Sequence, residues 1–447
     1  MHKRLLDILQ NYLESSPPSL ARPLLLLTTL FLVNPVWATS LNELVQSGLQ
    51  HNSLIKKSDL QIELTEAKRV ESRAKRFGEF DMVGSYTHYN SPRTLAPIVP
   101  SALSPTSSVD TTQDLFSTGM QYSVPLFTGG AMERQVDIDN IAMQMSQSKK
   151  RLSREELIYN IRSLYISALS IEELIGSQEG YVEALSELQD KITYGVELGK
   201  RAKIELLKAN NDLTQAMGSV AKSKSSLKML THTLQALTHY GTIENLEPLN
   251  VQIVSRHSSL EESNLAKLER FRVQELEIQK GSKLVKKVEA SSKPQIALNA
   301  YIGHNYDLDQ FDPFEKEQLW QIGLNVKWDI FDFGKTSAKL QQVKIAKLQA
   351  IAQNEATTEG FKKLFAKAIN EIETAQTNYN TSESQYQLLQ ETEKIEKARY
   401  DAGVATLNDL LLATSKTELA KSQMIQSKYA YQNGVFYLDY LLERGER

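Results

Sequence analysis

Two different hydrophobic periods run along the chain. In segments 131–194 and 335–398, apolar residues recur at alternating steps of four and three, a heptad-like spacing that predicts long helices wound around one another. The two seams are Leu157, Ile161, Leu164, Ala168, Ile171 and Ile175 in the first segment, and Phe361, Phe365, Ala368, Ile372, Ala375 and Tyr379 in the second. Each segment has 64 residues, and a helix of that length spans about 96 Å. An ordinary globular core needs no helix that long.

Four shorter segments alternate with a period of two and predict β-strands near 80–89, 119–127, 295–303 and 319–331. In the last of these, the even positions from Trp320 to Ile330 are all apolar. One apolar and one polar face is typical of membrane β-strands, but an antiparallel sheet that covers a soluble core alternates in the same way. Segments 90–118 and 304–318 are predicted to be the hairpin loops.

The sequence also contains an internal repeat. Segments 204 residues apart match without a gap: Gly119–Gly130 with Gly323–Gly334, Gly199 with Gly403, Glu205 with Asp409, Leu206 with Leu410, and Ala209 with Ala413. We expect two copies of one structural unit, 39–240 and 260–447, joined by a linker at 241–259.

The N-terminal segment predicts export. An apolar run from Pro23 to Val33 follows Lys3, Arg4 and Arg22, and Val36-Trp37-Ala38 has the pattern of a cleavage site. The run is too short for a transmembrane helix, so we expect residues 1–38 to be a cleaved signal peptide. The alternatives are an uncleaved anchor and a core helix.

Composition narrows the functional classes. The chain has no cysteine, which excludes disulfides, thiolate zinc sites, a cysteine nucleophile and an acylated N-terminal cysteine. A net charge of -3 argues against nucleic acid as a partner, and a mean hydropathy of -0.36 argues against a bundle of membrane-spanning helices. The histidines show no ligand spacing, and neither a Walker loop nor a GxSxG motif occurs. We therefore expect no enzymatic activity and no catalytic, cofactor or metal site.

Strand number predicts an oligomer. Four strands cannot close a transmembrane barrel, whose smallest single-chain form has about eight strands. Open sheet edges are not tolerated in lipid. If the strands lie in a membrane, several chains must therefore contribute to one barrel.

The signal peptide, the repeat, the alternating hairpins and the heptad helices together resemble the TolC family of outer-membrane channel proteins. The most specific parts are the strand-to-helix motifs, with Pro125, Phe127 and Gly130 in one copy and Trp328, Phe331 and Gly334 in the other, and the segment from Arg399 to Ala413. The resemblance implies a mostly α, α+β membrane protein: a homotrimer with a shared twelve-strand β-barrel in the outer-membrane lipid of a Gram-negative cell and an α-helical barrel across the periplasm. It also implies a passive exit duct of a tripartite efflux pump or a type I secretion system, joined by a periplasmic adaptor to an inner-membrane transporter. The alternative is a non-conducting coiled-coil scaffold or adhesin stalk.

The resemblance places adaptor contacts at two helix–helix turns, which we call the first tip, near Gly199, and the second tip, near Gly403. The residues concerned are Gly199, Glu205, Leu206 and Ala209 in the first tip, and Tyr400, Gly403, Thr406, Asp409, Leu410 and Ala413 in the second. The first tip departs from the pattern, because residues 200–203 read Lys-Arg-Ala-Lys where the second tip has Val-Ala-Thr-Leu. It therefore either matches adaptors less well or binds a partner with an acidic face.

Acidic residues just before the second tip suggest a pore gate. Glu393, Glu396 and Asp401 would form rings of negative charge when repeated by symmetry, an arrangement that selects cations. The alternative is a solvated helix face in which these side chains pair with Lys394 and Lys397.

Overall fold

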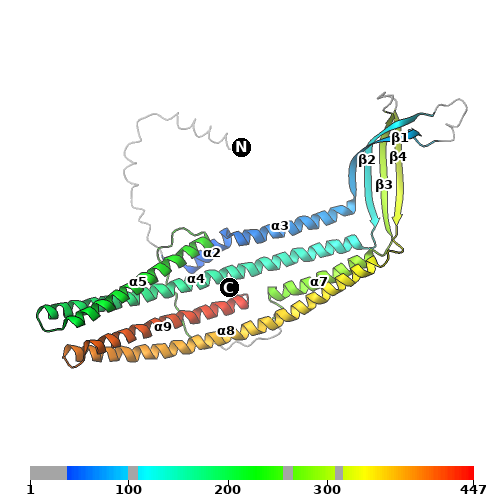
Figure 1. Cartoon of the computed structure of the whole chain (residues 1–447). Helices are drawn as coiled ribbons and strands as arrows, with labels where there is room; N and C mark the ends of the chain where they lie inside the picture. Colours follow the sequence, from blue (N-terminus) through cyan, green and yellow to red (C-terminus); the bar gives the residue numbers. More distant parts are fainter. Residues whose placement is uncertain (1–37, 99–108, 255–264, 308–315, 447) are drawn as a thin grey trace, which may run out of the picture.

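The computed structural model describes residues 38–98, 109–254, 265–307 and 316–446. Within them the chain is mostly helical, with one small antiparallel sheet, as predicted. Figure 1 shows an elongated molecule in which long helices lie roughly side by side and the sheet projects from one end. The predicted signal peptide and its cleavage pattern, as far as Trp37, lie outside the described residues, as do positions 255–259 of the predicted linker.

The helices are long because nothing interrupts them. Their bounds are α2 Leu41–His51, α3 Ser53–Ala74, α4 Ala131–Glu197, α5 Lys203–Thr238, α7 Glu269–Ala290, α8 Lys335–Asp401 and α9 Leu407–Leu441, with a short 3₁₀ turn η1 Lys75–Phe77. Both α4 and α8 have 67 residues, three more than predicted, because the helix continues up to the turn before each tip glycine. At about 1.5 Å per residue each spans about 100 Å.

The strands are β1 Glu79–Thr94, β2 Thr111–Phe127, β3 Gln295–Asp307 and β4 Lys316–Lys327, in the order β1-β2-β3-β4. β1 and β2 extend into the segment predicted as a loop at 90–118, where Thr94 pairs with Thr111. That prediction was wrong because Pro92 was read as a loop residue. β1 is an edge strand with a register shift between His88 and Arg93, and a proline is tolerated there.

β3 and β4 likewise extend into the predicted loop at 304–318, since Tyr306 pairs with Lys316. The other end of β4 was also predicted wrongly, because the strand stops at Lys327 and not at Phe331. After Lys327 the chain has to turn into α8. The Asp332 carboxylate accepts hydrogen bonds from the backbone N–H of Gly334 (3.1 Å) and of Thr336 (2.7 Å), which fixes this turn.

The heptad seams form the core of the helical region. Leu157, Ile161 and Ala168 of α4 are at most 3% exposed and pack with α2, α5 and α9. The Tyr165 hydroxyl donates to the carbonyl oxygens of Thr39 (3.1 Å) and Glu247 (2.7 Å), which holds the described part of the linker against α4. Phe361, Phe365, Ala368 and Ile372 of α8 form the equivalent core with α9 and α7.

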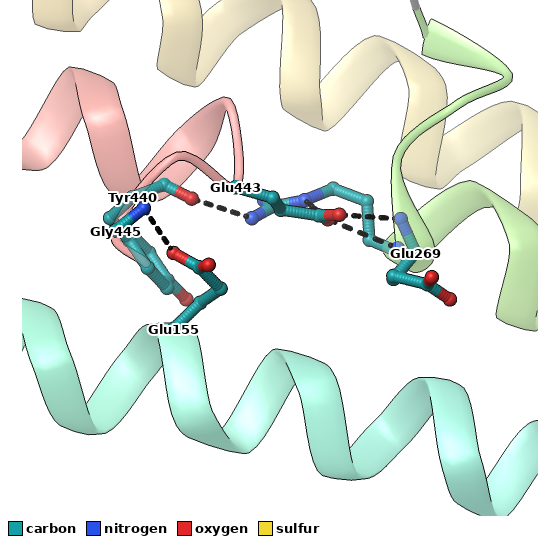
Figure 2. A network of polar contacts seen from close by, with 6 residues as sticks. Glu155, Glu269, Tyr440, Glu443 and Gly445 are labelled. Carbon is teal, nitrogen blue, oxygen red and sulfur yellow. Dashed lines mark hydrogen bonds and ion pairs between the residues drawn. The ribbon is translucent and has the colours of Figure 1, made fainter. Parts of the chain in front are cut away.

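The chain end beyond α9 ties three helices together, as Figure 2 shows; we call this cluster the C-terminal joint. The Glu443 carboxylate accepts from the backbone N–H of Glu269 (2.6 Å) and of Arg270 (3.2 Å) at the start of α7, and from Arg270 Nε (3.2 Å). The Gly445 N–H donates to Glu155 of α4 at 2.7 Å. Burial raises the pKa of Glu155 above its usual range. The joint thus holds α4, α7 and α9 together at mid-length.

Candidate functional site

The sheet has one apolar and one polar face, because the register aligns even-numbered residues across all four strands. One row across the sheet reads Met82, Met120, Ile302 and Trp320, each the direct partner of the next. The row beside it, on the opposite face, reads Asp81, Gln121, Tyr301 and Gln321. The large side chains that project from the apolar face are Phe80, Met82, Tyr86, Met120, Ile302, Trp320, Ile322, Leu324 and Val326, each at least 50% exposed.

Polar contacts confirm the character of the other face. Ser117 donates to Asn305 Oδ1 at 2.7 Å, and Ser123 donates to Asn299 Oδ1 at 2.8 Å, both between β2 and β3. An apolar face of this size, uncovered by any described part of the chain, is suited to contact with lipid, whereas the polar face is suited to water.

The strand-to-helix motifs lie where the sheet meets the helices. Gly130 and Gly334 are the N-terminal caps of α4 and α8, with φ of 93° and 85°, a conformation that favours glycine. Pro125 and Phe127 flank a register shift in β2.

Aromatic side chains are exposed at the same junction. Trp328 donates its indole N–H to the Ser292 carbonyl at 3.0 Å, and Phe331 packs edge-on against Phe333. The exposed fractions of Trp328, Phe331 and Phe333 are 54%, 75% and 91%. An aromatic cluster at the end of a sheet with an apolar face matches the girdles that flank the lipid-facing band of membrane strands.

The two tips have the same backbone. The first tip, Gly195–Ala209, turns at Gly199 (φ 70°), and the second tip, Arg399–Ala413, turns at Gly403 (φ 74°). The equivalent closing bonds, Lys200 N–H to the Gly195 carbonyl and Val404 N–H to the Arg399 carbonyl, are both 2.8 Å long. Both tips lie at the end of the molecule remote from the sheet (Figure 1).

Side chains then distinguish the tips. In the second tip, Thr406 and Asp409 form a capping box at the start of α9, with Asp409 N–H donating to Thr406 Oγ1 and Thr406 N–H donating to Asp409 Oδ2. These bonds from Thr406 lower the pKa of Asp409. In the first tip Ala202 occupies the cap position, and Glu205 instead pairs with Arg201 at 3.3 Å.

The tips are packed together by a contact that the sequence analysis missed. The Arg201 guanidinium lies 4.5 Å from the centre of the Tyr400 ring, and Tyr400 is only 4% exposed. Burial raises the pKa of the Tyr400 hydroxyl. Gly195 makes room for this contact, since a Cβ there would lie 2.6 Å from Arg201 Cγ. Leu410 and Ala209 are buried in the same core, Leu206 packs against it, and Ala413 is buried beside it on α9.

A surface groove of about 480 Å³ runs between α5 and α9 just behind the tips. Its walls include Leu207 and Leu412, which are 55% and 51% exposed, and Leu411 is buried behind them. Lys208 and Asp212 on α5 and Asn408 on α9 contribute its polar rim. The groove can therefore hold an amphipathic helix of another protein.

The acidic residues proposed for the gate are not gathered into one cluster within the chain. Glu396 is 18% exposed and pairs with Arg399 at 2.7 Å, whereas Asp401 is exposed in the last turn of α8. Glu393 is half-buried, and Lys394, its expected partner in the alternative interpretation, pairs instead with Glu391.

Two classes of site were also sought over the described ranges. No group of three or more His, Cys, Asp or Glu side chains there is arranged to hold a metal ion. Nor does any described helix carry an apolar stretch long enough to cross a membrane.

Comparison with known proteins gives consistent matches. The family model of the outer membrane efflux protein matches residues 44–238 and 262–442. Outer membrane protein TolC of Salmonella enteritidis is 20% identical over 423 residues, which cover 91% of this chain and 82% of that protein. Among solved structures, CusC superimposes with a TM-score of 0.78 at 18% identity, covering 90% of this chain and 91% of that one. The Campylobacter jejuni CmeC outer membrane channel gives 0.75 at 19% identity, covering 91% and 86%.

Proposed function

Because the chain belongs to the outer membrane efflux protein family, the TolC family, we propose that three copies of it assemble into one continuous channel. The protein is an outer-membrane exit channel of efflux pumps, placed in the Gram-negative outer membrane and extending into the periplasm. The observation that carries the trimer is a set of contacts that each chain leaves open on both of its sides.

The same neighbour is lacking at every level of the molecule. α4 packs against α3, α5, α7 and α9, whereas its counterpart α8 packs only against α7 and α9, with no extended packing on α3 or α5 in the described part of the chain. In the sheet, β1 pairs with β2 and β4 pairs with β3, so each has a free edge. A second copy that places its α3, α5 and β1 against α8 and β4 would supply all of these contacts.

Strand number and direction fit this assembly. With four antiparallel strands per chain, β4 of one copy and β1 of the next also run antiparallel, so the ladder can continue from copy to copy. Three copies would give a closed barrel of twelve strands, which leaves no edge in lipid. The apolar face would contact the outer-membrane lipid and the polar face would line the pore.

We further propose that residues 39–240 and 260–447 are two copies of one unit, joined by the linker at 241–259. The bounds of α4 and α8 differ by 204 residues at both ends, and α5 and α9 begin 204 residues apart. α3 and α7 both have 22 residues and begin 216 residues apart, which means that the first hairpin is longer by twelve residues. Such equivalence would give a trimer a pseudo-sixfold ring of helices.

The tips are proposed to bind a periplasmic adaptor that connects the channel to an inner-membrane transporter. The groove between α5 and α9 and the exposed turns at Gly199 and Gly403 support this assignment. Around the trimer axis, Glu393, Glu396 and Asp401 would be repeated near the narrow end, where they are proposed to form the gate. A non-conducting scaffold would have no need for a sheet with one wholly apolar face. The cargo, including a secreted protein in a type I system, is set by the transporter.

Engineered cysteines test the trimer directly, because the natural chain has none. Glu79 begins β1 and Lys327 ends β4, so both lie at the helix end of the sheet but on opposite edges. Three inter-strand steps separate them within one chain, about 14 Å, which is too far for a disulfide.

In E79C/K327C, a short bis-maleimide should therefore produce covalent dimers and trimers and nothing larger. Each single variant serves as control and should stay monomeric on denaturing gels. The purified wild-type protein should conduct ions in planar bilayers. Products that stop at dimers or extend beyond trimers, or a protein without conductance, would refute the proposed assembly.

A further inference from the structure

The two tips share one backbone but carry opposite charge. The first tip, Gly195–Ala209, has four basic and two acidic side chains, a net charge of +2. The equivalent fifteen residues of the second tip, Arg399–Ala413, have one basic and two acidic side chains, a net charge of -1. Two surfaces with the same backbone geometry thus differ mainly in electrostatics.

The basic charge of the first tip is directed to solvent. Lys200, Lys203 and Lys208 are all exposed, and none of them has an acidic partner among the described residues. The structure needs only Arg201, which is held between Glu205 and the Tyr400 ring. The three lysines have no such internal role, and an unpaired basic patch on a turn is available to a negatively charged partner.

The second tip offers no equivalent basic patch. Its turn residues Val404 and Ala405 are uncharged, and Asp401 and Asp409 are both exposed. Arg399, its one cation, is paired with Glu396.

We propose that the first tip is a docking surface for an acidic helical segment of the periplasmic partner, and that the second tip docks a segment that is not acidic. This rests on the proposed function, which places the tips against an adaptor. The partner lies in the groove between α5 and α9, with its apolar side against Leu207 and Leu412. Its acidic side chains face Lys203 and Lys208, and its other edge faces Asn408 of α9.

This charge pattern has a consequence for assembly. In a trimer the six tips alternate around the ring, so a partner is distinguished by charge at neighbouring positions. Like charges placed opposite one another would be disfavoured, which fixes the rotational register of the partner on the channel.

Photo-cross-linking in the full-length channel tests the assignment. Benzoylphenylalanine replaces Leu198 (49% exposed) in the first tip or Val404 (71% exposed) in the second, and the captured peptides are sequenced by mass spectrometry. We expect the helical segment captured at 198 to carry a net negative charge, and the segment captured at 404 to be neutral or basic. A neutral or basic segment at 198, or no product there, would overturn the proposal.

Charge reversal gives the second readout. K200E/K203E should lower the cross-linking yield at position 198 about tenfold or more, because attraction becomes repulsion. K200R/K203R should keep the yield. K222E/K228E, which makes the same change at exposed positions of α5 away from the tip, is the matched control and should also keep it.

The two proposals fail differently. Thermal unfolding in detergent checks that each variant is folded. An unchanged yield in folded K200E/K203E would refute charge-selective docking while leaving a conducting trimer intact. Loss of conductance and of the covalent trimer in the otherwise natural chain would instead refute the channel assembly.

Discussion

Removal of the Glu443 carboxylate should loosen the start of α7 more than any nearby surface change. Glu443 is the acceptor for two backbone N–H groups at the first turn of α7 and for the guanidinium of Arg270 (Figure 2). The side chains of Arg270 and Glu443 are only 18% and 9% exposed. Glu443→Ala therefore leaves a mostly buried cation and two helix N–H groups without their acceptor.

The magnitude follows from these contacts. Breaking a buried ion pair from one side costs about 3–5 kcal/mol, and loss of a helix cap costs about 1 kcal/mol. Arg270 also packs over the rings of Phe361 and Tyr440, and these contacts remain in the variant. We therefore expect a local destabilisation at the lower end, about 3 kcal/mol. That corresponds to about 100-fold faster local opening, since about 1.4 kcal/mol is a factor of ten.

Hydrogen exchange with mass spectrometry on the assembled channel measures this locally, without requiring reversible unfolding. Peptides that contain the first turns of α7 should exchange about 100-fold faster in Glu443→Ala. The matched control is Glu446→Ala, which removes the partner of Arg154 in a pair whose side chains are 31% and 48% exposed. A pair of that exposure contributes about 0–1 kcal/mol, so its effect on exchange should be less than about fivefold. Equal exchange in the two variants would show that Glu443 does not hold α7.

Three further predictions concern other parts of the molecule. Because burial raises the pKa of Glu155, the folded state binds its proton more readily than the unfolded chain; Glu155→Gln should therefore raise the melting temperature at neutral pH, and a pH series should show the gain shrinking as the pH falls through the raised pKa. Gly403→Ala, at φ 74°, should destabilise the second tip by about 1 kcal/mol, whereas Gly360→Ala, at an uncrowded position within α8, should stabilise that helix by up to about 1 kcal/mol; exchange of the two regions in opposite directions is the result to look for. Leu324→Arg on the apolar sheet face should cost about 2–4 kcal/mol when the protein folds into lipid vesicles, and Asn325→Arg on the polar face should cost much less; similar costs would contradict the assignment of the faces.

Local features of the chain were predictable because they depend on neighbours in sequence. The heptad spacing located α4 and α8, and the glycines at 199 and 403 located the turns, since only local backbone preference decides which residue adopts a positive φ. The 204-residue offset likewise indicated equivalent helices before any coordinates were known. Strand ends were less predictable, because Pro92 is acceptable in an edge strand and nothing local identifies β1 as an edge.

Contacts between distant residues were decided only by the tertiary structure. Alternation within one strand says that it has an apolar face, but the register of three pairings is what aligns Met82, Met120, Ile302 and Trp320 into a single row. Arg201 had appeared only as part of a basic departure from the repeat, yet it packs on Tyr400 about two hundred residues away. The joint between Glu443 and the start of α7 left no local trace in the sequence. Such pairs form because the fold brings remote segments together, and no local pattern of residues encodes which partner each side chain meets.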